Sequence, residues 1–333
     1  MSGGIDSSVA AALLKRAGFD VIGVFMKLNN FSLEAENRAE RVAKFLKIPF
    51  YTFNFEKEFK KRIVDYFLKE HKKGRTPNPC VVCNKEIKFG LLLEKALALN
   101  ADFIATGHYA RLRRAGKNFK LFRAKDKDKD QSYFLWKLDQ KQLSRTLFPI
   151  GNSTRKEVEL LARKFKLPVL SARKSIEICF IPKTIEDFLK KYLKEKSGRI
   201  IDTKGEILGK HKGLWFYTIG QRKGLKLPSG PYYVTAKDFK KNILIVSKNK
   251  KDLVKKELIA KNVNWISGKK PQLPLRVKAK IRYRHEAVPA ILYKLRTKNY
   301  KLIFQKSQRA ITPGQSVVFY KREELLGGGI IHQ

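Results

Sequence analysis

A short turn rich in glycine and serine leads directly into an apolar helical run at the start of the chain. The turn comprises Met1 to Ser8, and the apolar run from Val9 to Leu14 ends before Gly18. Glycine lets the backbone turn tightly with its amide hydrogens exposed, and the positive end of a helix attracts anions. The turn matches neither the Walker A nor the Rossmann spacing. It therefore predicts either an anion cradle of another kind or ordinary helix capping.

Apolar runs and amphipathic helical stretches alternate in the first part of the chain. This alternation is typical of a doubly wound α/β domain, which binds ligands beyond the carboxyl ends of its parallel strands. A phosphate loop in such a domain follows a strand of its own, so we expect the first strand upstream of Met1. Strands are expected at 21–26, 50–55 and 102–106, and helices at 34–47, 59–67 and 84–99.

Two local motifs complete the first part of the chain. Residues 109–124 predict a basic hairpin, and Thr154–Glu157 has the residues of a capping box.

The pattern changes beyond residue 182. After it, short apolar runs separated by glycine and lysine predict a small β-rich module, and strands dominate from about residue 258. Residues 276–284 alternate basic and apolar side chains, which predicts a strand with one cationic face.

We therefore expect three domains. They are an N-terminal α/β domain at 1–182, a small central β-rich domain at 183–248 and a C-terminal, closed or nearly closed β-domain at 249–333.

The chain is strongly basic. It has 73 Lys and Arg against 30 Asp and Glu, which gives a formal net charge of +43. Such a balance suits a polyanionic partner, and nucleic acid is the leading candidate. The alternative is a lysine-rich proteome that makes every protein basic. No stretch approaches the roughly 18 apolar residues of a membrane span, and the first residues do not form a signal sequence. We expect a cytoplasmic protein without a membrane partner.

The chain has three cysteines. Cys80 and Cys83 form a lone Cys-x-x-Cys without the second pair that a zinc site needs. We expect this motif in a proline-stiffened loop before a helix capped by Asn84, where Arg75 and Lys85 would lower the thiol pKa. Cys179 lies in an apolar run, where the structural alternative is a buried, inert thiol.

Eight blocks of residues follow one another along the chain, at Ser2–Ser8, Phe25–Lys27, Gly74–Pro79 with Cys83–Phe89, Ala105–Tyr109, Lys129–Leu135, Ile178–Ile181, Thr218–Gly224 and Thr312–Gln315. The first block is similar to the pyrophosphate-binding loop of enzymes that adenylate a substrate with ATP. In this order the blocks resemble the tRNA-specific 2-thiouridylases, and the resemblance covers the whole chain. It implies an N-terminal PP-loop domain of the adenine-nucleotide hydrolase-like type, a small central tRNA-binding domain and a C-terminal β-barrel.

The resemblance also implies a reaction. ATP would adenylate the 2-carbonyl oxygen of the wobble uridine in the tRNAs for Lys, Glu and Gln. A persulfide on Cys179 would then supply the sulfur and Cys83 would act as the nucleophile, leaving a transient disulfide between them. The products would be 2-thiouridine, AMP and pyrophosphate. The implied partners are tRNA and a sulfur-relay protein or cysteine desulfurase, and the implied cofactors are ATP and Mg²⁺; we expect a monomer.

Family positions assign the remaining site residues. Cys80 stands where many relatives have an acidic residue, so another group would have to supply that carboxylate's function. The alternative to a tRNA contact for His108 is an ordinary polar residue at the end of a helix or strand. For Lys129 and Arg282 the alternative is a solvated charge. The implied ATP site is Ser2, Gly3, Gly4, Ile5, Asp6, Ser7, Met26 and Gly107; the target base would contact Asn78, Pro79 and Cys80; and the tRNA would contact His108, Lys129, Asp130, Gln131, Arg282, Tyr283 and Gln315.

Two alternatives remain open. In the first, Cys80, Cys83 and Cys179 bind an iron-sulfur cluster whose open iron accepts the sulfur, and no other metal site is expected. In the second, the chain is a non-catalytic RNA-binding protein with a relic nucleotide loop.

Overall fold

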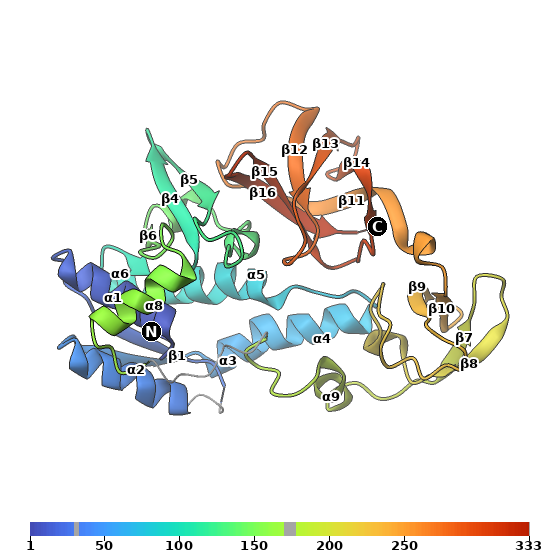
Figure 1. The fold of residues 1–333 in the computed structure, drawn as a ribbon, viewed down its shortest axis with the longest axis horizontal. Helices are drawn as coiled ribbons and strands as arrows, with labels where there is room; N and C mark the ends of the chain where they lie inside the picture. Colours follow the sequence, from blue (N-terminus) through green and yellow to red (C-terminus); the bar gives the residue numbers. More distant parts are fainter. Residues whose placement is uncertain (30–32, 170–177, 333) are drawn as a thin grey trace.

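Parallel strands and helices form the N-terminal part of the molecule (Figure 1). The computed structural model describes residues 1–29, 33–169 and 178–332. Strand β1 pairs with β2 and β3 pairs with β6, both in parallel. Among the described residues the parallel sheet therefore consists of two separate pairs, and the strand expected at 102–106 is shorter than predicted. These strands are β1 (Gly23–Lys27), β2 (Phe50–Asn54), β3 (Ile104–Ala105) and β6 (Thr146–Leu147).

Helix α1 (Ile5–Arg16) packs against α8 (Arg155–Lys164). Both present small or branched apolar side chains to a shared core, in which Val9 and Val158 are fully buried. The capping box predicted at Thr154 is confirmed: its hydroxyl accepts from the Glu157 amide, and the Glu157 carboxylate accepts from the Thr154 amide. Helix α2 (Leu33–Phe45) lies between β1 and β2 in the chain.

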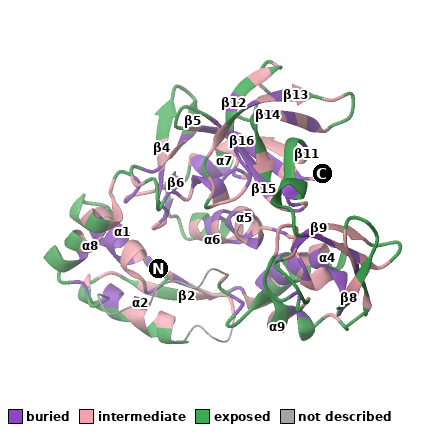
Figure 2. Cartoon of the chain, turned by 45° about the vertical axis from the view of Figure 1, so that its right-hand side comes forward, coloured by how far each residue is buried: buried purple, intermediate pink, exposed green. Residues whose placement is uncertain are grey.

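Two long helical segments follow (Figure 1). They pack through a core of large apolar side chains that includes Phe59, Phe67 and Ile87, and Figure 2 shows buried residues along α5 and α6. The first segment is α3 (Glu56–Phe59), the π-helix η1 (Lys60–Val64) and α4 (Asp65–Lys72); the second is α5 (Pro79–Cys83), the π-helix η2 (Asn84–Leu91) and α6 (Leu92–Ala98).

The start of the second segment differs from the expectation. Both Cys80 and Cys83 lie in helix α5, which begins at Pro79 because proline suits the first helical position. Asn84 lies inside the helical segment, and its side-chain amide donates to the carbonyl oxygen of Phe134 at 3.0 Å. The prediction of a loop closed by an Asn84 cap is therefore wrong.

The predicted basic hairpin is present as β4 (Ala110–Ala115) and β5 (Asn118–Arg123). Strand β5 also pairs with the C-terminal strand β16, at Glu324 with Phe122 and Leu325 with Leu121. This pairing makes the hairpin an extension of the C-terminal sheet. The short elements that follow are η3 (Ser132–Phe134) and α7 (Gln140–Leu143).

A four-stranded sheet of order β8-β7-β10-β9 forms the centre of the chain. Its core contains Ile200, Leu214, Val234 and Leu244, all buried. This confirms the small β-rich module. Its elements are β7 (Gly198–Ile201), β8 (Ile207–His211), η4 (Leu214–Phe216), β9 (Tyr233–Asp238) and β10 (Ile243–Ser247), preceded by α9 (Ile185–Lys190).

The C-terminal strands close into a six-stranded barrel, because β11 pairs with both β14 and β16. This confirms the expected β-barrel. Strand β12 ends at Lys280, so the strand predicted over 276–284 is too long and Arg282 and Tyr283 lie in the turn after it. The barrel contains β11 (Val254–Trp265), β12 (Leu275–Lys280), β13 (Val288–Lys294), β14 (Tyr300–Arg309), β15 (Ser316–Lys321) and β16 (Glu324–Ile331), preceded by η5 (Lys250–Leu253).

Within the described ranges, no helix combines the length and the apolar character needed to cross a membrane.

Candidate active site

The opening turn is held in shape by its own side chains. The hydroxyls of Ser7 and Ser8 donate to the carbonyl oxygen of Gly4 at 3.0 and 2.9 Å, and the Ser2 amide donates to Ser7 Oγ at 3.1 Å. Gly4 is the N-cap of α1 and makes no side-chain capping bond. The serines therefore fix the turn without capping the first-turn amides, which suits an anion cradle.

Two glycines are required by close backbone approaches around this turn. Gly3 has φ +68°, and a Cβ there would lie 2.4 Å from the carbonyl oxygen of Ala35. A Cβ on Gly107, which follows β3, would lie 2.7 Å from both the Asp6 carbonyl carbon and the Ser7 nitrogen. The structure thus brings Gly107 directly against the turn, as an ATP site built from both segments would need.

Asp6 is fixed by two partners from other segments. Its Oδ1 accepts from the Tyr109 hydroxyl at 2.7 Å and from Arg155 Nη1 at 2.6 Å. Ile5 is partly buried beside the α1–α8 core, while Met26 on β1 packs against the core that contains Cys83. The predicted ATP-site residues therefore frame the ends of β1 and β3.

The three thiols occupy one neighbourhood. Cys83 is buried, Cys80 is half-buried and Cys179 is exposed, and all three are free. Phe180 shares the core of Cys83, and its ring lies 5.7 Å from the Phe59 ring and 5.4 Å from the Phe67 ring. This packing fixes the turn that carries Cys179 beside helix α5, across 96 residues of sequence between Cys83 and Cys179.

Desolvation disfavours the thiolate forms. Burial raises the pKa of Cys83 to about 12, and the protein atoms around the more accessible Cys80 and Cys179 thiols raise their pKa values as well. The lowered pKa expected from Arg75 and Lys85 is wrong, because desolvation is the largest effect on these thiols. Both cations also have a carboxylate partner elsewhere. Arg75 Nε lies 2.6 Å from Glu70 Oε2, and Lys85 pairs with Asp139.

Lys88 supplies the positive charge that the sequence reasoning missed. Its charge opposes the pKa rise at all three thiols and also lowers the pKa of His108. Lys88 lies five residues after Cys83 within the π-helix η2. A π-helix has more residues per turn than an α-helix, so residues five apart approach the same face. An α-helical prediction gave no such signal, although Lys88 lies inside one of the matched blocks.

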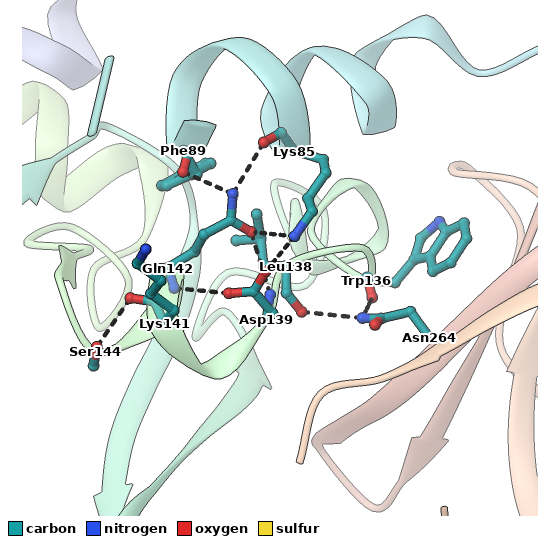
Figure 3. Close-up of polar contacts among 9 residues, drawn as sticks. All are labelled: Lys85, Phe89, Trp136, Leu138, Asp139, Lys141, Gln142, Ser144 and Asn264. Atoms are coloured by element: carbon teal, nitrogen blue, oxygen red, sulfur yellow. Dashed lines mark hydrogen bonds and ion pairs between the residues drawn. The ribbon is translucent and has the colours of Figure 1, made fainter. Parts of the chain in front are cut away.

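Polar contacts hold the π-helix in place (Figure 3). The side-chain amide of Gln142 donates to the carbonyl oxygens of Lys85 and Phe89 at 3.0 and 2.7 Å. Lys85 Nζ donates to Gln142 Oε1 at 2.9 Å. From the barrel, Asn264 donates to the carbonyl oxygens of Trp136 and Leu138. The helix that carries Cys83 and Lys88 is thereby tied to α7, and the segment before α7 to the barrel.

Several predicted tRNA contacts are engaged within the protein. His108 is buried, its Nδ1 lies 2.9 Å from Thr106 Oγ1, and burial together with Lys88 lowers its pKa well below the usual range. Asp130 is buried and accepts from Arg123 Nε at 3.0 Å and from two backbone amides. Gln131 accepts from the Tyr109 amide at 3.0 Å. Lys129 is exposed.

The remaining predicted contacts surround the loop before α5. Tyr283 lies with its ring 4.5 Å from the Phe134 ring, and Arg282 donates to Thr312 Oγ1 at 3.4 Å. Asn78 is the N-cap residue of α5, directly before Pro79, and its side chain lies near enough to Tyr133 to lower the pKa of that hydroxyl against the effect of burial. The structure therefore gathers these residues where the barrel meets the N-terminus of α5.

Loop 73–78 also contacts both β-rich domains. Gln315 Nε2 donates to the carbonyl oxygen of Thr76 at 2.9 Å, and the Thr76 amide donates to the Pro313 carbonyl at 2.8 Å. From the central sheet, Lys237 Nζ donates to the Gly74 carbonyl at 3.0 Å. This three-way junction was not foreseen from the sequence.

The described part of the chain contains no group of three or more His, Cys, Asp or Glu residues arranged to hold a metal ion. In the arrangement described above, the three thiols do not form such a ligand set.

Fold and site together define a HUP-domain enzyme with two appended β-rich domains. Family models match the chain in three consecutive segments: "tRNA methyl transferase HUP domain" at residues 1–183, "tRNA methyl transferase PRC-barrel domain" at 186–248 and "Aminomethyltransferase beta-barrel domain" at 255–331.

Similar proteins carry a more specific name. A tRNA-specific 2-thiouridylase MnmA of Halothermothrix orenii is 47% identical over 354 residues, covering 100% of this chain and 98% of the relative. MnmA 2 of Thermoanaerobacter sp. is 47% identical over 352 residues, with 100% and 96% covered. MnmA of Clostridium perfringens is 45% identical over 350 residues, with 99% and 96% covered. The chain belongs to the tRNA-specific 2-thiouridylase family.

Proposed function

We propose that this chain is an ATP-dependent tRNA 2-thiouridylase acting on the wobble uridine of the tRNAs for Lys, Glu and Gln. One continuous set of contacts carries the proposal. The opening turn touches Gly107, the next residue is His108, and Lys88 acts electrostatically on both His108 and the thiols. This proximity supports a phosphate cradle and a sulfur-transfer site that are joined through adjacent residues.

In the first step, the uridine 2-carbonyl oxygen attacks the α-phosphate of ATP. The bond between the α- and β-phosphates breaks, and pyrophosphate leaves. Backbone amides between Gly3 and Ser7 hold this leaving group, since the N-cap residue Gly4 provides no side-chain acceptor and the amides of Ser2 and Ser8 donate within the turn. Met26 and Gly107 flank the nucleotide, and bound Mg²⁺ supplies charge neutralisation of the phosphates.

In the second step, sulfur replaces the activated oxygen. Cys179 carries the persulfide because it is exposed and can receive sulfur from a relay protein or desulfurase. Cys83 attacks the sulfur of Cys179, which releases the terminal sulfur to the adenylated carbon and leaves a disulfide between the two residues. AMP departs with the former carbonyl oxygen. Lys88 stabilises the thiolates that form in turn.

The tRNA is bound by the two β-rich domains and the loops around α5. We assign nucleotide binding to residues 1–182, and tRNA contacts to 183–248 and to the barrel at 249–333, in a monomer. The target base contacts Asn78, Pro79 and Cys80, and Lys129, Arg282 and Tyr283 contact the tRNA. His108, Asp130, Gln131 and Gln315 support these surfaces through the internal hydrogen bonds described above. A base already in a loop is cheap to extrude.

Purified protein incubated with tRNA, ATP and a persulfide source tests the proposal. Digested tRNA is expected to contain 2-thiouridine by mass, and pyrophosphate release is expected to depend on tRNA. A binding protein with a relic loop would retain tRNA without turnover. If the tRNA product instead carries an added methyl group, and no oxygen has been exchanged for sulfur, the proposal is overturned. That result would favour the methyl transferase activity named in the family model's description.

A further inference from the structure

Cys80 is a third thiol to which the proposed reaction gives no sulfur chemistry. It lies three residues before Cys83 on helix α5, and residues three apart are neighbours on a helix surface. The two thiols are therefore adjacent. Cys80 is more accessible than Cys83, since Cys80 is half-buried and Cys83 is buried.

Cys179 approaches the same pair from another segment. The ring of Phe180 packs into the core that also contains Val81 and Cys83. Asn29 Nδ2 at the end of β1 donates to the Cys179 carbonyl oxygen at 3.4 Å. Anchored from both sides, Cys179 lies close enough for its charge to act on Cys80 and on Cys83. The three thiols thus form one cluster.

We propose that Cys80 is a resolving thiol that frees Cys179 after each turnover. The inference rests on the proposed function, in which sulfur transfer ends with a disulfide between Cys83 and Cys179. The Cys80 thiolate attacks Cys83 Sγ, the Cys80–Cys83 bond forms, and the Cys83–Cys179 bond breaks. Cys179 leaves as a thiolate and takes up a proton. One disulfide replaces another, so the protein is neither oxidised nor reduced in this step.

An external dithiol then completes the cycle. It transfers two electrons to the Cys80–Cys83 disulfide, is itself oxidised to a disulfide, and returns both cysteines to the thiol form. Cys80 is the accessible sulfur of that bond, whereas direct attack on Cys83 is obstructed by burial. Attack of the dithiol on Cys179 would pass through a mixed disulfide on the thiol that must accept the next persulfide, until the second thiol of the dithiol displaces it. Resolution through Cys80 leaves Cys179 free throughout the reduction.

Lys88 supports the exchange. Its charge acts on Cys80, Cys83 and Cys179 alike. Each step of the exchange moves a negative charge from one of these sulfurs to another, and a cation beside all three stabilises each thiolate as it forms.

Disulfide mapping after a single turnover tests the inference. Full-length protein with a persulfide on Cys179 is mixed with ATP and tRNA without reductant, quenched with an alkylating agent at successive times, and analysed by peptide mass under non-reducing conditions. We expect the Cys83–Cys179 link first and the Cys80–Cys83 link growing as it declines. A persistent Cys83–Cys179 link with Cys80 alkylated would overturn the inference. Absence of 2-thiouridine from the same samples would remove the proposed function together with the inference.

A variant pair gives a second measurement. In Cys80→Ser the rate of the second turnover relative to the first is expected to fall by about tenfold, with the Cys83–Cys179 link accumulating and excess dithiol restoring the ratio. Val82→Ser on the same helix is the control and should keep the wild-type ratio. A Cys80→Ser protein that is slower in both turnovers by the same factor would contradict a resolving role.

Discussion

Gln315 donates its side-chain amide to the carbonyl oxygen of Thr76 at 2.9 Å and lies 3.3 Å from that of Pro77, which ties the barrel to the loop that precedes Cys80. Gln315 can thus act on the site by positioning this loop, independently of any contact with tRNA.

Gln315→Ala should therefore lower stability even without tRNA. Loss of the bonds to loop 73–78 is expected to reduce the free energy of unfolding by about 1–2 kcal/mol, as measured by denaturant unfolding. Gln308→Ala is a matched control, because the Gln308 side-chain amide donates to the nearby carbonyls of Lys306 and Ser307 on its own strand. Equal stability of the two variants would mean that the Gln315 bonds do not hold the loop.

Gly107→Ala should impair the nucleotide step. The added methyl would lie 2.7 Å from the backbone of Asp6 and Ser7 and would displace the turn. Displacement of about 1 Å at a reacting centre can lower a rate by about 10²-fold, so tRNA-dependent pyrophosphate release should fall by that order. Gly116→Asn is the control, since Gly116 at the hairpin tip has open space around it. Unchanged pyrophosphate release in Gly107→Ala would separate Gly107 from the ATP site.

Cys179→Ser should abolish thiolation and spare tRNA-dependent pyrophosphate release, because adenylation precedes sulfur transfer. Both products can be measured in one reaction, as 2-thiouridine by mass and as pyrophosphate. Gly107→Ala is the converse variant, in which both products decline together. Parallel loss of both products in Cys179→Ser would contradict the assigned order of steps.

Removal of the Lys88 charge should make the thiols harder to ionise. Desolvation by the surrounding protein already raises the pKa of Cys179, and Lys88 opposes that rise. In Lys88→Met the pH dependence of Cys179 alkylation should therefore move to higher pH. Lys88→Arg keeps the charge and should retain most of the wild-type profile. A profile that does not move in Lys88→Met would place the cation too far away to act.

Lys237 should give a distinct pH dependence of stability. Burial lowers its pKa from 10.5 to about 8. Between these values the unfolded chain holds a proton that the folded chain lacks, so this group's contribution raises stability as pH increases from about 8 to 10.5. The full change is about 3 kcal/mol. Unfolding of wild type and Lys237→Met should show this difference between their pH profiles, and Lys240→Met, at an exposed lysine, should follow the wild type. Parallel profiles for wild type and Lys237→Met would contradict the lowered pKa.

Local patterns predicted most of the elements. The capping box at Thr154, the hairpin at 109–124 and the barrel strands depend on residues close in sequence, and all are present. The start of α5 was placed too late because proline was interpreted as a loop former, although it also suits the first turn of a helix. The strand that begins near Arg276 was predicted to extend too far, because the alternation of basic and apolar residues continues into the turn that contains Arg282.

The arrangement of the candidate site could not be predicted from local sequence patterns. The thiol cluster depends on Phe180 packing against Phe59 and Phe67, contacts that link distant segments. Lys88 was missed because nothing local indicates a π-helix, which Gln142 holds from 53 residues away. The thiol pKa values were predicted in the wrong direction because burial, a tertiary property, outweighs the nearby cations.

One edge of strand β5 (Asn118–Arg123) pairs with β4, and its other edge pairs with Glu324 and Leu325 of β16, some 200 residues later in the chain. A ribosome therefore releases the hairpin long before its partner strand exists. During synthesis, one edge of β5 stays unpaired until Glu324 and Leu325 have been translated, and an unpaired strand edge is a template for association with other chains. Polypeptides ending before residue 324 should accordingly tend to aggregate, even though the whole nucleotide-binding part has already been made.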